Sequence, residues 1–160
     1  MNVYGTEQIR NVVLLGHGGA GKTTVAEALA MVTGVTKRMG KVPDGNTISD
    51  YDKEEIKRQF SISTTLIPLE FQGDNGPMKL NLLDTPGFFD FVGEVEEAIS
   101  VADAAIIVVN CKAGIEPGTE KAWEMCEKYK LPRMIFVTNM DDDHASYREL
   151  VVKLETKFGR

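Results

Sequence analysis

The sequence has 160 residues, of which 42% are hydrophobic and 26% are charged. A chain of this length and composition can bury most of its apolar surface in one globular domain, which excludes a disordered tail. Lys and Arg number 18 against 24 Asp and Glu, for a net charge of −6, so no overall positive field exists for nucleic-acid phosphates. We therefore expect no DNA binding, and RNA contacts only at local basic sites.

The apolar runs are far shorter than the roughly 20 residues needed to cross a bilayer, as residues 104–109 illustrate. The first residues do not form a signal peptide, so we expect no membrane association and a cytoplasmic location. The two cysteines, Cys111 and Cys126, have no metal-ligand spacing and no disulfide framework. We expect them to be reduced, buried thiols.

The apolar pattern alternates between short runs and helical spacing, which indicates an α/β fold with a mostly parallel sheet. A strand over residues 11–15 precedes a helix from about residue 21 to residue 33, which Gly34 ends. From residue 37 to residue 61 the apolar period is lost and turn residues cluster, which predicts a long loop. Long loops in compact domains are usually functional.

Turn residues 73–76, among them Asn75, separate two strand-like segments at residues 66–72 and 78–83. This spacing predicts a hairpin, and therefore one antiparallel edge strand. Further along, the apolar run at residues 104–109 predicts a strand in the middle of the sheet.

A buried strand at residues 133–138 and three helices complete the predicted fold. The helices are assigned from apolar side chains at helical spacing. One carries Val92, Val95, Ile99 and Ala102, the next runs from Pro117 to about Lys130, and the last carries Tyr147, Leu150, Val151, Leu154 and Phe158. Trp123, Met125 and Cys126 are interpreted as packing residues of the middle helix.

The most specific motif lies between the first strand and the first helix, where G-x-x-x-x-G-K-[ST] is matched from Gly16 to Thr23. Glycines let the backbone bend so that successive N–H groups and the helix N-terminus point at phosphate oxygens. Lys22 neutralises these oxygens and Thr23 can ligate magnesium. The expected phosphate-contacting residues are His17, Gly18, Gly19, Ala20, Gly21, Lys22, Thr23 and Thr24. The His17 ring itself is interpreted as a bystander, because the loop works through main-chain groups.

Two later segments narrow the choice of nucleotide. Asp84 ends an apolar strand and can hold a magnesium-bound water, and the N–H of Gly87 in the following turn can reach a γ-phosphate. Asp141 follows another strand, where a carboxylate can accept hydrogen bonds from N1–H and the amino group of guanine. Adenine lacks those donors, so the nucleotide is expected to be GTP or GDP.

These three ordered motifs resemble the GTP-binding domain of translational GTPases, most closely elongation factor G and its paralogues. The resemblance also includes Asp90-Phe91, Gly114-Ile115-Glu116-Pro117 and Pro132-Arg133, and it covers nearly the whole chain. It implies a three-layer, phosphate-loop fold of the small-GTPase type, with Mg²⁺ as the metal and the ribosome as the partner of the full-length factor. It also implies that residues 41–63 form switch I, that residues 84–93 form switch II, and that Ser61 takes the place of a threonine on magnesium.

Several positions depart from the family pattern around the attacking water. Phe88 stands where the family has a histidine that orients this water, Gly18 and Gly19 replace an apolar residue and an aspartate, and Phe60 replaces an isoleucine. A phenyl ring offers no hydrogen bond. We expect Lys22 and Gly87 to support hydrolysis, but slowly, because positioning provides most of the catalysis in phosphoryl transfer. The alternative is that Phe88 only packs, while another residue positions the water.

The base motif N-K-x-D appears as Thr138, Asn139, Met140 and Asp141. Thr138 lacks the amide that braces the loop in the family, and Asn139 lacks the lysine stem that covers the base. We therefore expect guanine preference with weakened affinity. The alternative for Asp141 and its acidic neighbours is an acidic turn that caps the last helix.

The sequence ends before the family's fifth guanine-binding motif. We expect residues 1–160 to be a partial GTP-binding domain without that motif and without the last strand and helix, whose uncovered sheet edge can self-associate.

Two other functions remain open: a nucleotide-gated binding module that does not hydrolyse, and an ATPase of the deviant phosphate-loop class. The charged stretch from Asp50 to Arg58 is interpreted as a solvated face, or alternatively as a contact with ribosomal RNA.

Overall fold

A computed structural model describes residues 3–74 and 76–159. Its core is a five-stranded sheet with the order β2-β3-β1-β4-β5. The strands are β1 (Ile9–Leu15), β2 (Thr65–Gly73), β3 (Gly76–Asp84), β4 (Ala104–Asn110) and β5 (Arg133–Thr138). All neighbours pair in parallel except β2 and β3. The α/β class and the antiparallel edge strand are therefore confirmed.

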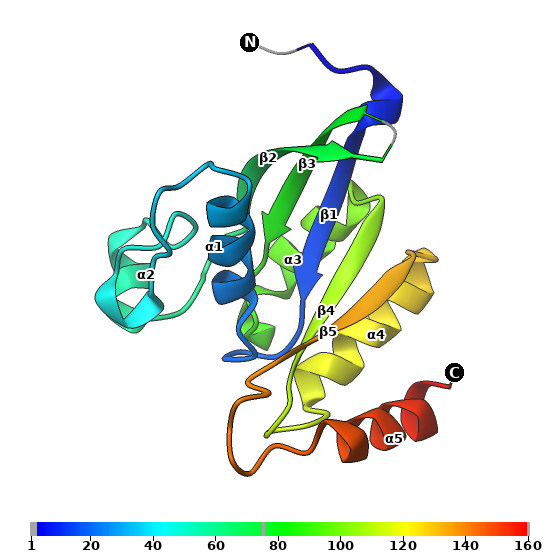
Figure 1. Ribbon diagram of the computed structural model, residues 1–160. Coiled ribbons are helices and arrows are strands. Elements are labelled where there is room, and N and C mark those ends of the chain that lie inside the picture. The colour runs from blue at the N-terminus through cyan, green and yellow to red at the C-terminus, as the bar shows by residue number, and fades with distance from the viewer. Residues whose placement is uncertain (1–2, 75, 160) are drawn as a thin grey trace.

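Helices cover both faces of the sheet, so that the domain has three layers (Figure 1). The helices are α1 (Lys22–Val32), α2 (Lys53–Arg58), α3 (Val92–Ser100), α4 (Pro117–Tyr129) and α5 (Tyr147–Phe158), and short 3₁₀ turns occur at Thr6–Gln8, Val42–Asp44 and Phe89–Phe91. Among the described residues, every helix is too short or too polar to span a membrane.

The alternation of side chains along the central strands explains the layers. Leu14 and Val108 face the α1 side and pack with Ala26. Their chain neighbours Val13 and Ile107 face the opposite side, where α3, α4 and α5 cover them. Because both faces are covered, β4 is apolar from Ala104 to Val109 and β1 is apolar from Val12 to Leu15, as expected for interior strands.

Three predicted features differ in the structure. The long loop contains α2, whose first turn is stabilised by a capping box between Asp52 and Glu55. Helix α3 ends at Ser100, so Ala102 lies beyond it. Strand β5 is at the sheet edge and is not buried, since Met134 and Phe136 are 55% and 43% exposed.

The predicted hairpin between β2 and β3 is confirmed, and its register places Gly73 opposite Gly76. Asn75 of the predicted turn lies outside the described residues. Both cysteines are free and buried, as expected.

Candidate nucleotide-binding site

The phosphate loop connects the end of β1, an interior strand of the sheet, to the start of α1. Ligands of α/β proteins bind at such carboxyl ends of the strands. Gly16 has a φ of +140°, and a Cβ there would lie 2.4 Å from the carbonyl oxygen of Val108. Gly21, with a φ of +98°, turns the chain into α1. These two conformations require glycine, so the motif is confirmed as a sharp turn that opens a helix.

Lys22 lies under this loop, and its Nζ donates hydrogen bonds to the carbonyl oxygens of Gly16 and His17, at 3.1 and 3.0 Å. Burial lowers the pKa of Lys22 to about 8, although the carboxylates of Asp84 and Asp50 partly oppose this shift. At neutral pH the ammonium therefore remains charged. It is a buried positive charge at the position where the motif places phosphate oxygens.

Gly87 brings the turn after β3 against this lysine. A Cβ on Gly87 would lie 2.4 Å from Lys22 Nζ and 2.7 Å from the backbone nitrogen of Gly18. Two segments that are far apart in the sequence, the phosphate loop with Gly18 and Lys22 and the turn with Gly87, thus converge on one point, as expected for a γ-phosphate site. The close approach also explains why no side chain fits at residue 87.

The three expected magnesium ligands lie together. Thr23 Oγ1 donates to Asp84 Oδ2 at 2.9 Å and lies 3.3 Å from Ser61 Oγ. Burial raises the pKa of Asp84 to about 6, while its bond from Thr23 and the charge of Lys22 lower it. One oxygen of Asp84, Oδ1, is buried without a hydrogen-bond partner.

Asp50 joins this group, although the sequence analysis placed it on a solvated face. It is only 4% exposed, and its Oδ1 accepts a 2.7 Å hydrogen bond from Ser61 Oγ. Burial is the largest cause of its raised pKa, and its Oδ2 has no partner. Asp50 was missed because charge alternation along the chain does not reveal that the loop folds back over α1.

Glu55 is a second correction to the solvated face. It is buried, and its Oε1 accepts hydrogen bonds from the backbone of Ile62 and Ser63 at 2.9 and 3.1 Å. The carboxylate thereby holds the segment that follows Ser61. The other charged residues of this stretch, Asp52, Lys53, Glu54, Lys57 and Arg58, are exposed as expected.

The donor set fits a hard cation. Within the described residues, His, Cys, Asp and Glu side chains form no group of three that could hold a metal. The hydroxyls of Thr23 and Ser61 with the unpartnered oxygens of Asp50 and Asp84 instead provide a cluster made only of oxygens, which Mg²⁺ prefers when phosphates complete its shell.

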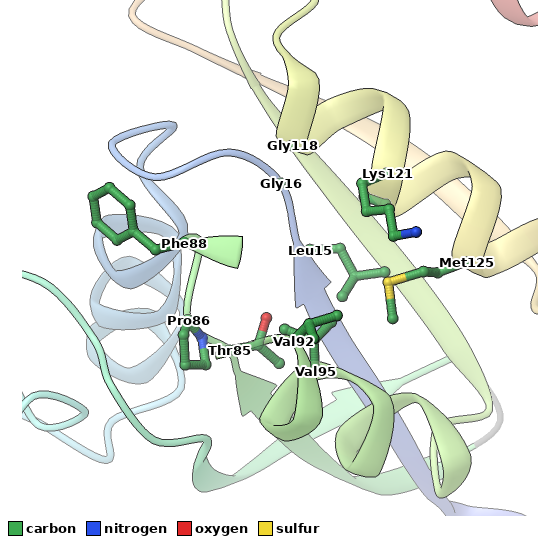
Figure 2. A pocket seen from close by; sticks show the side chains of 12 residues that line it. Leu15, Gly16, Thr85, Pro86, Phe88, Val92, Val95, Gly118, Lys121 and Met125 are labelled. Carbon is green, nitrogen blue, oxygen red and sulfur yellow. The ribbon is translucent and has the colours of Figure 1, made fainter. Parts of the chain in front are cut away.

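Phe88 packs on the phosphate loop. Its ring atoms would lie 3.0–3.1 Å from a Cβ at Gly18, and its centroid is 4.8 Å from that of Phe60. Phe88 also lines a cavity of about 40 Å³ together with Leu15, Val95 and Met125, which Figure 2 shows from close by. The altered positions 18, 60 and 88 therefore form one apolar contact, in which glycine at residue 18 makes room for the ring.

The His17 side chain fastens the phosphate loop to α4. Its Nδ1 accepts a hydrogen bond from Gly118 N–H at 3.3 Å, and its Nε2 lies 3.6 Å from Glu116 Oε1. This packing role agrees with the interpretation of the His17 ring as a bystander. That the ring makes no contact with phosphate stays a prediction.

The expected base-binding residues line a second cavity of about 650 Å³ next to the loop. Thr24, Thr138, Asn139 and Asp141 are the polar side chains among its otherwise mostly apolar lining. The loss of the bracing amide is compensated, because Thr138 Oγ1 donates a 2.7 Å hydrogen bond to the carbonyl oxygen of Ala20. The helix-capping alternative is wrong for Asp141, because Ser146 is the N-cap of α5 and accepts from Glu149 N–H.

Comparison with known proteins identifies the family. Residues 7–160 match the family described as "Elongation factor Tu GTP binding domain". The chain is 38% identical to "Elongation factor G-like protein" of Mycobacterium tuberculosis over 151 residues, and 38% identical to "Ribosome-releasing factor 2, mitochondrial" of Drosophila grimshawi over 149 residues.

A solved structure also matches the fold. The crystal structure of ttk003000868 from Thermus thermophilus is 42% identical, with a TM-score of 0.89 over 95% of this chain and 22% of that chain. The alignments with the two relatives cover 94% and 93% of this chain, but only 21% and 20% of the relatives' own length. The chain thus spans about a fifth of the proteins it matches. Over residues 7–160, this chain belongs to the family of elongation factor Tu GTP-binding domains.

Proposed function

We propose that this domain binds GTP or GDP with Mg²⁺ and acts as a nucleotide-dependent switch that hydrolyses GTP slowly. The carrying observation is the convergence of Lys22, Gly18 and Gly87 beside the oxygen cluster of Thr23, Ser61, Asp50 and Asp84. Ser61 belongs to switch I and Gly87 to switch II. A γ-phosphate at this point can therefore order both segments at once.

Each residue of the site has a distinct role in this proposal. The loop amides and Lys22 bind the phosphates, and Gly87 N–H contacts the γ-phosphate. Thr23, Ser61, Asp50 and Asp84 would hold Mg²⁺, which neutralises charge on the phosphate oxygens when bound. Asp141 would accept hydrogen bonds from guanine, at the end of the cavity that Thr24 and Thr138 also line.

Calorimetric titration with GDP, a non-hydrolysable GTP analogue and ATP, each with Mg²⁺, tests the binding. Guanine nucleotides are expected to bind and ATP is not, because only guanine provides the donors that Asp141 needs. Preference for ATP would instead support the ATPase of the deviant phosphate-loop class. Equal affinity for ATP and GTP would remove the role given to Asp141.

Slow hydrolysis follows from Phe88, whose ring can neither accept a proton from water nor stabilise developing charge. Losing one such group typically costs about 10²–10³-fold in rate. Phe88→His should therefore raise the single-turnover rate without a matching change in GTP affinity, and Phe88→Leu is the control. Rapid hydrolysis by the unaltered protein in the presence of ribosomes would contradict this proposal.

The second candidate is a nucleotide-gated module that does not hydrolyse. The apolar contact of Phe88 with Phe60 and Gly18 favours this module, because the Phe88 ring fills space next to the proposed γ-phosphate site. Tight GTP binding with no detectable phosphate release would support this module.

For the whole protein we propose the ribosome as partner, since one relative is named a ribosome-releasing factor. Cytoplasmic location stays a prediction.

A further inference from the structure

Gln59 has a backbone conformation that its residue type disfavours. It ends α2 with φ +57° and ψ +37°, and its N–H donates to the carbonyl oxygen of Glu55. This left-handed conformation crowds the Cβ of an ordinary residue against its own backbone, whereas glycine adopts it freely. A left-handed residue is a common helix end, as Lys130 after α4 also shows, so this conformation fixes where the Gln59 side chain begins and does not by itself assign it a role.

The position of Gln59 suggests what the side chain is for. It lines a cavity of about 230 Å³ together with Lys22, Gly87 and Phe88, which is the cavity proposed for the phosphates. Of the described residues that line this cavity, Gln59 alone has an amide side chain. Among the described residues no hydrogen bond is formed by the Gln59 amide, whereas Lys22, Ser61 and Asp50 all have partners.

The neighbours of Gln59 are held in place. The ring of the next residue, Phe60, contacts Phe88 at 4.8 Å between centroids, and Ser61 is bonded to Asp50. On the other side, the Glu55 carbonyl holds the Gln59 backbone. Gln59 is therefore held at the edge of the cavity by contacts of the residues before and after it in the chain.

A carboxamide has the chemistry that Phe88 lacks. Attack of water on a γ-phosphate requires an acceptor that orients the water, and a donor near the developing charge assists it. A glutamine provides both through its carbonyl oxygen and its NH₂ group. A phenyl ring provides neither.

We propose that Gln59 is a catalytic residue that orients the attacking water, and that the hydrolysis which remains despite Phe88 depends on it. This inference rests on the proposed GTP hydrolysis. Water positioning is thereby transferred from the turn after β3 to the end of α2, in switch I. The amide accepts a hydrogen bond from the water and forms no covalent bond.

Single-turnover GTP hydrolysis and nucleotide affinity, measured together in the intact protein, test the proposal. Gln59→Met keeps the side-chain length and the strained backbone but removes the amide. Gln59→Gly also removes the amide but relieves the strain. Both should lower the hydrolysis rate at least about tenfold and leave the Kd for GDP within about twofold. Gln72→Ala, an exposed glutamine on β2, is the matched control and should keep the normal rate.

The two substitutions separate catalysis from backbone structure. A purely structural role predicts that Gln59→Gly, which relieves strain, hydrolyses GTP as fast as the unaltered protein or faster. That result would overturn the proposal for Gln59 while leaving GTP hydrolysis intact. If the unaltered protein binds GTP but releases no phosphate, the proposed hydrolysis itself fails, and the role of Gln59 with it.

Discussion

At the scale of single residues, the site concentrates buried charge. Asp50 and Asp84 are two carboxylates facing one ammonium, Lys22, and each has an oxygen without a hydrogen-bond partner. Burying a charge is costly unless it is fully paired. The raised pKa values of both carboxylates and the lowered pKa of Lys22 express this cost. We infer that these charges serve to bind a charged ligand, and that they lower the stability of the domain when no ligand is bound.

The pH dependence of stability provides a test of this cost. The pKa of Asp84 is about 6 in the folded chain against an ordinary value of 3.8, so the folded state takes up a proton that the unfolded state does not. Without metal, stability should therefore rise as pH falls from 7.5 to 5, by about 1–3 kcal/mol from this residue. Asp84→Asn should remove that part of the pH dependence and weaken Mg²⁺ binding.

Urea unfolding at both pH values in the presence of a chelator measures this difference. Asp84→Asn is an informative comparison because an amide oxygen can still accept the hydrogen bond from Thr23. Equal pH dependence in the variant and the unaltered chain would show that the Asp84 carboxylate is not the group that titrates.

At the scale of elements, one buried side chain holds the beginning of switch I. Glu27, on α1, is 1% exposed, and its two carboxylate oxygens accept hydrogen bonds from the backbone N–H groups of Gly40 and Ile48. The end of switch I is held separately, by Glu55 and by Glu94, which accepts from Thr64 N–H at 2.7 Å. The loop is thus attached to α1 and to α3, with Ser61 between the two attachments.

Glu27→Ala should release the first of these attachments. One buried and one half-buried N–H group lose their acceptor, which costs about 2–4 kcal/mol, and the loop should open more often. Limited proteolysis with mass spectrometry should show faster cleavage within residues 36–50. Glu124→Ala, which alters only an exposed ion pair with Lys121, is the control. A cleavage rate no higher than that of this control would contradict the attachment.

The elements themselves were largely predictable, and the exceptions have identifiable causes. Strand β5 and helix α4 begin at the predicted residues, Arg133 and Pro117. Helix α2 was missed because the apolar period is absent there, although the Asp52-to-Glu55 capping box was a legible signal. β5 was expected to be buried because an apolar run does not show whether one face or both faces are covered.

At the scale of the whole molecule, one face of the sheet is incompletely covered. Met134 and Phe136 of β5 are exposed on the side of α1, where they line the large cavity with Leu29, Val32 and Met39. Among the described residues, β5 pairs only with β4, so its other edge has no partner. Open edges next to apolar side chains favour association.

We therefore predict that the 160-residue chain self-associates through β5. Sedimentation velocity should show an average mass that rises with concentration, and Phe136→Lys should reduce this rise because a charge then lies beside the open edge. Val152→Lys, at an exposed position on α5, should leave it unchanged. An unaltered chain that stays monomeric at all concentrations would contradict the prediction.

The sequence by itself determined the fold class, the phosphate loop, the order of the three motifs and the family. Each of these depends on local patterns, such as the spacing from Gly16 to Thr23 or the apolar run of β4, which are visible without knowing what lies opposite. Asp84 and Thr23 were identified in the same way, whereas Ser61 was identified through the resemblance to the family, and the structure brings the three together.

Only the tertiary structure decided which polar residues join the site. Asp50 and Glu55 are buried because the loop folds over α1, Thr138 braces Ala20 across 118 residues of sequence, and Gln59 lines the phosphate cavity. The physical reason is the same in each case. Burial and hydrogen bonding depend on what a side chain contacts, and for these residues the decisive contacts are made by the folded chain and not by the local pattern.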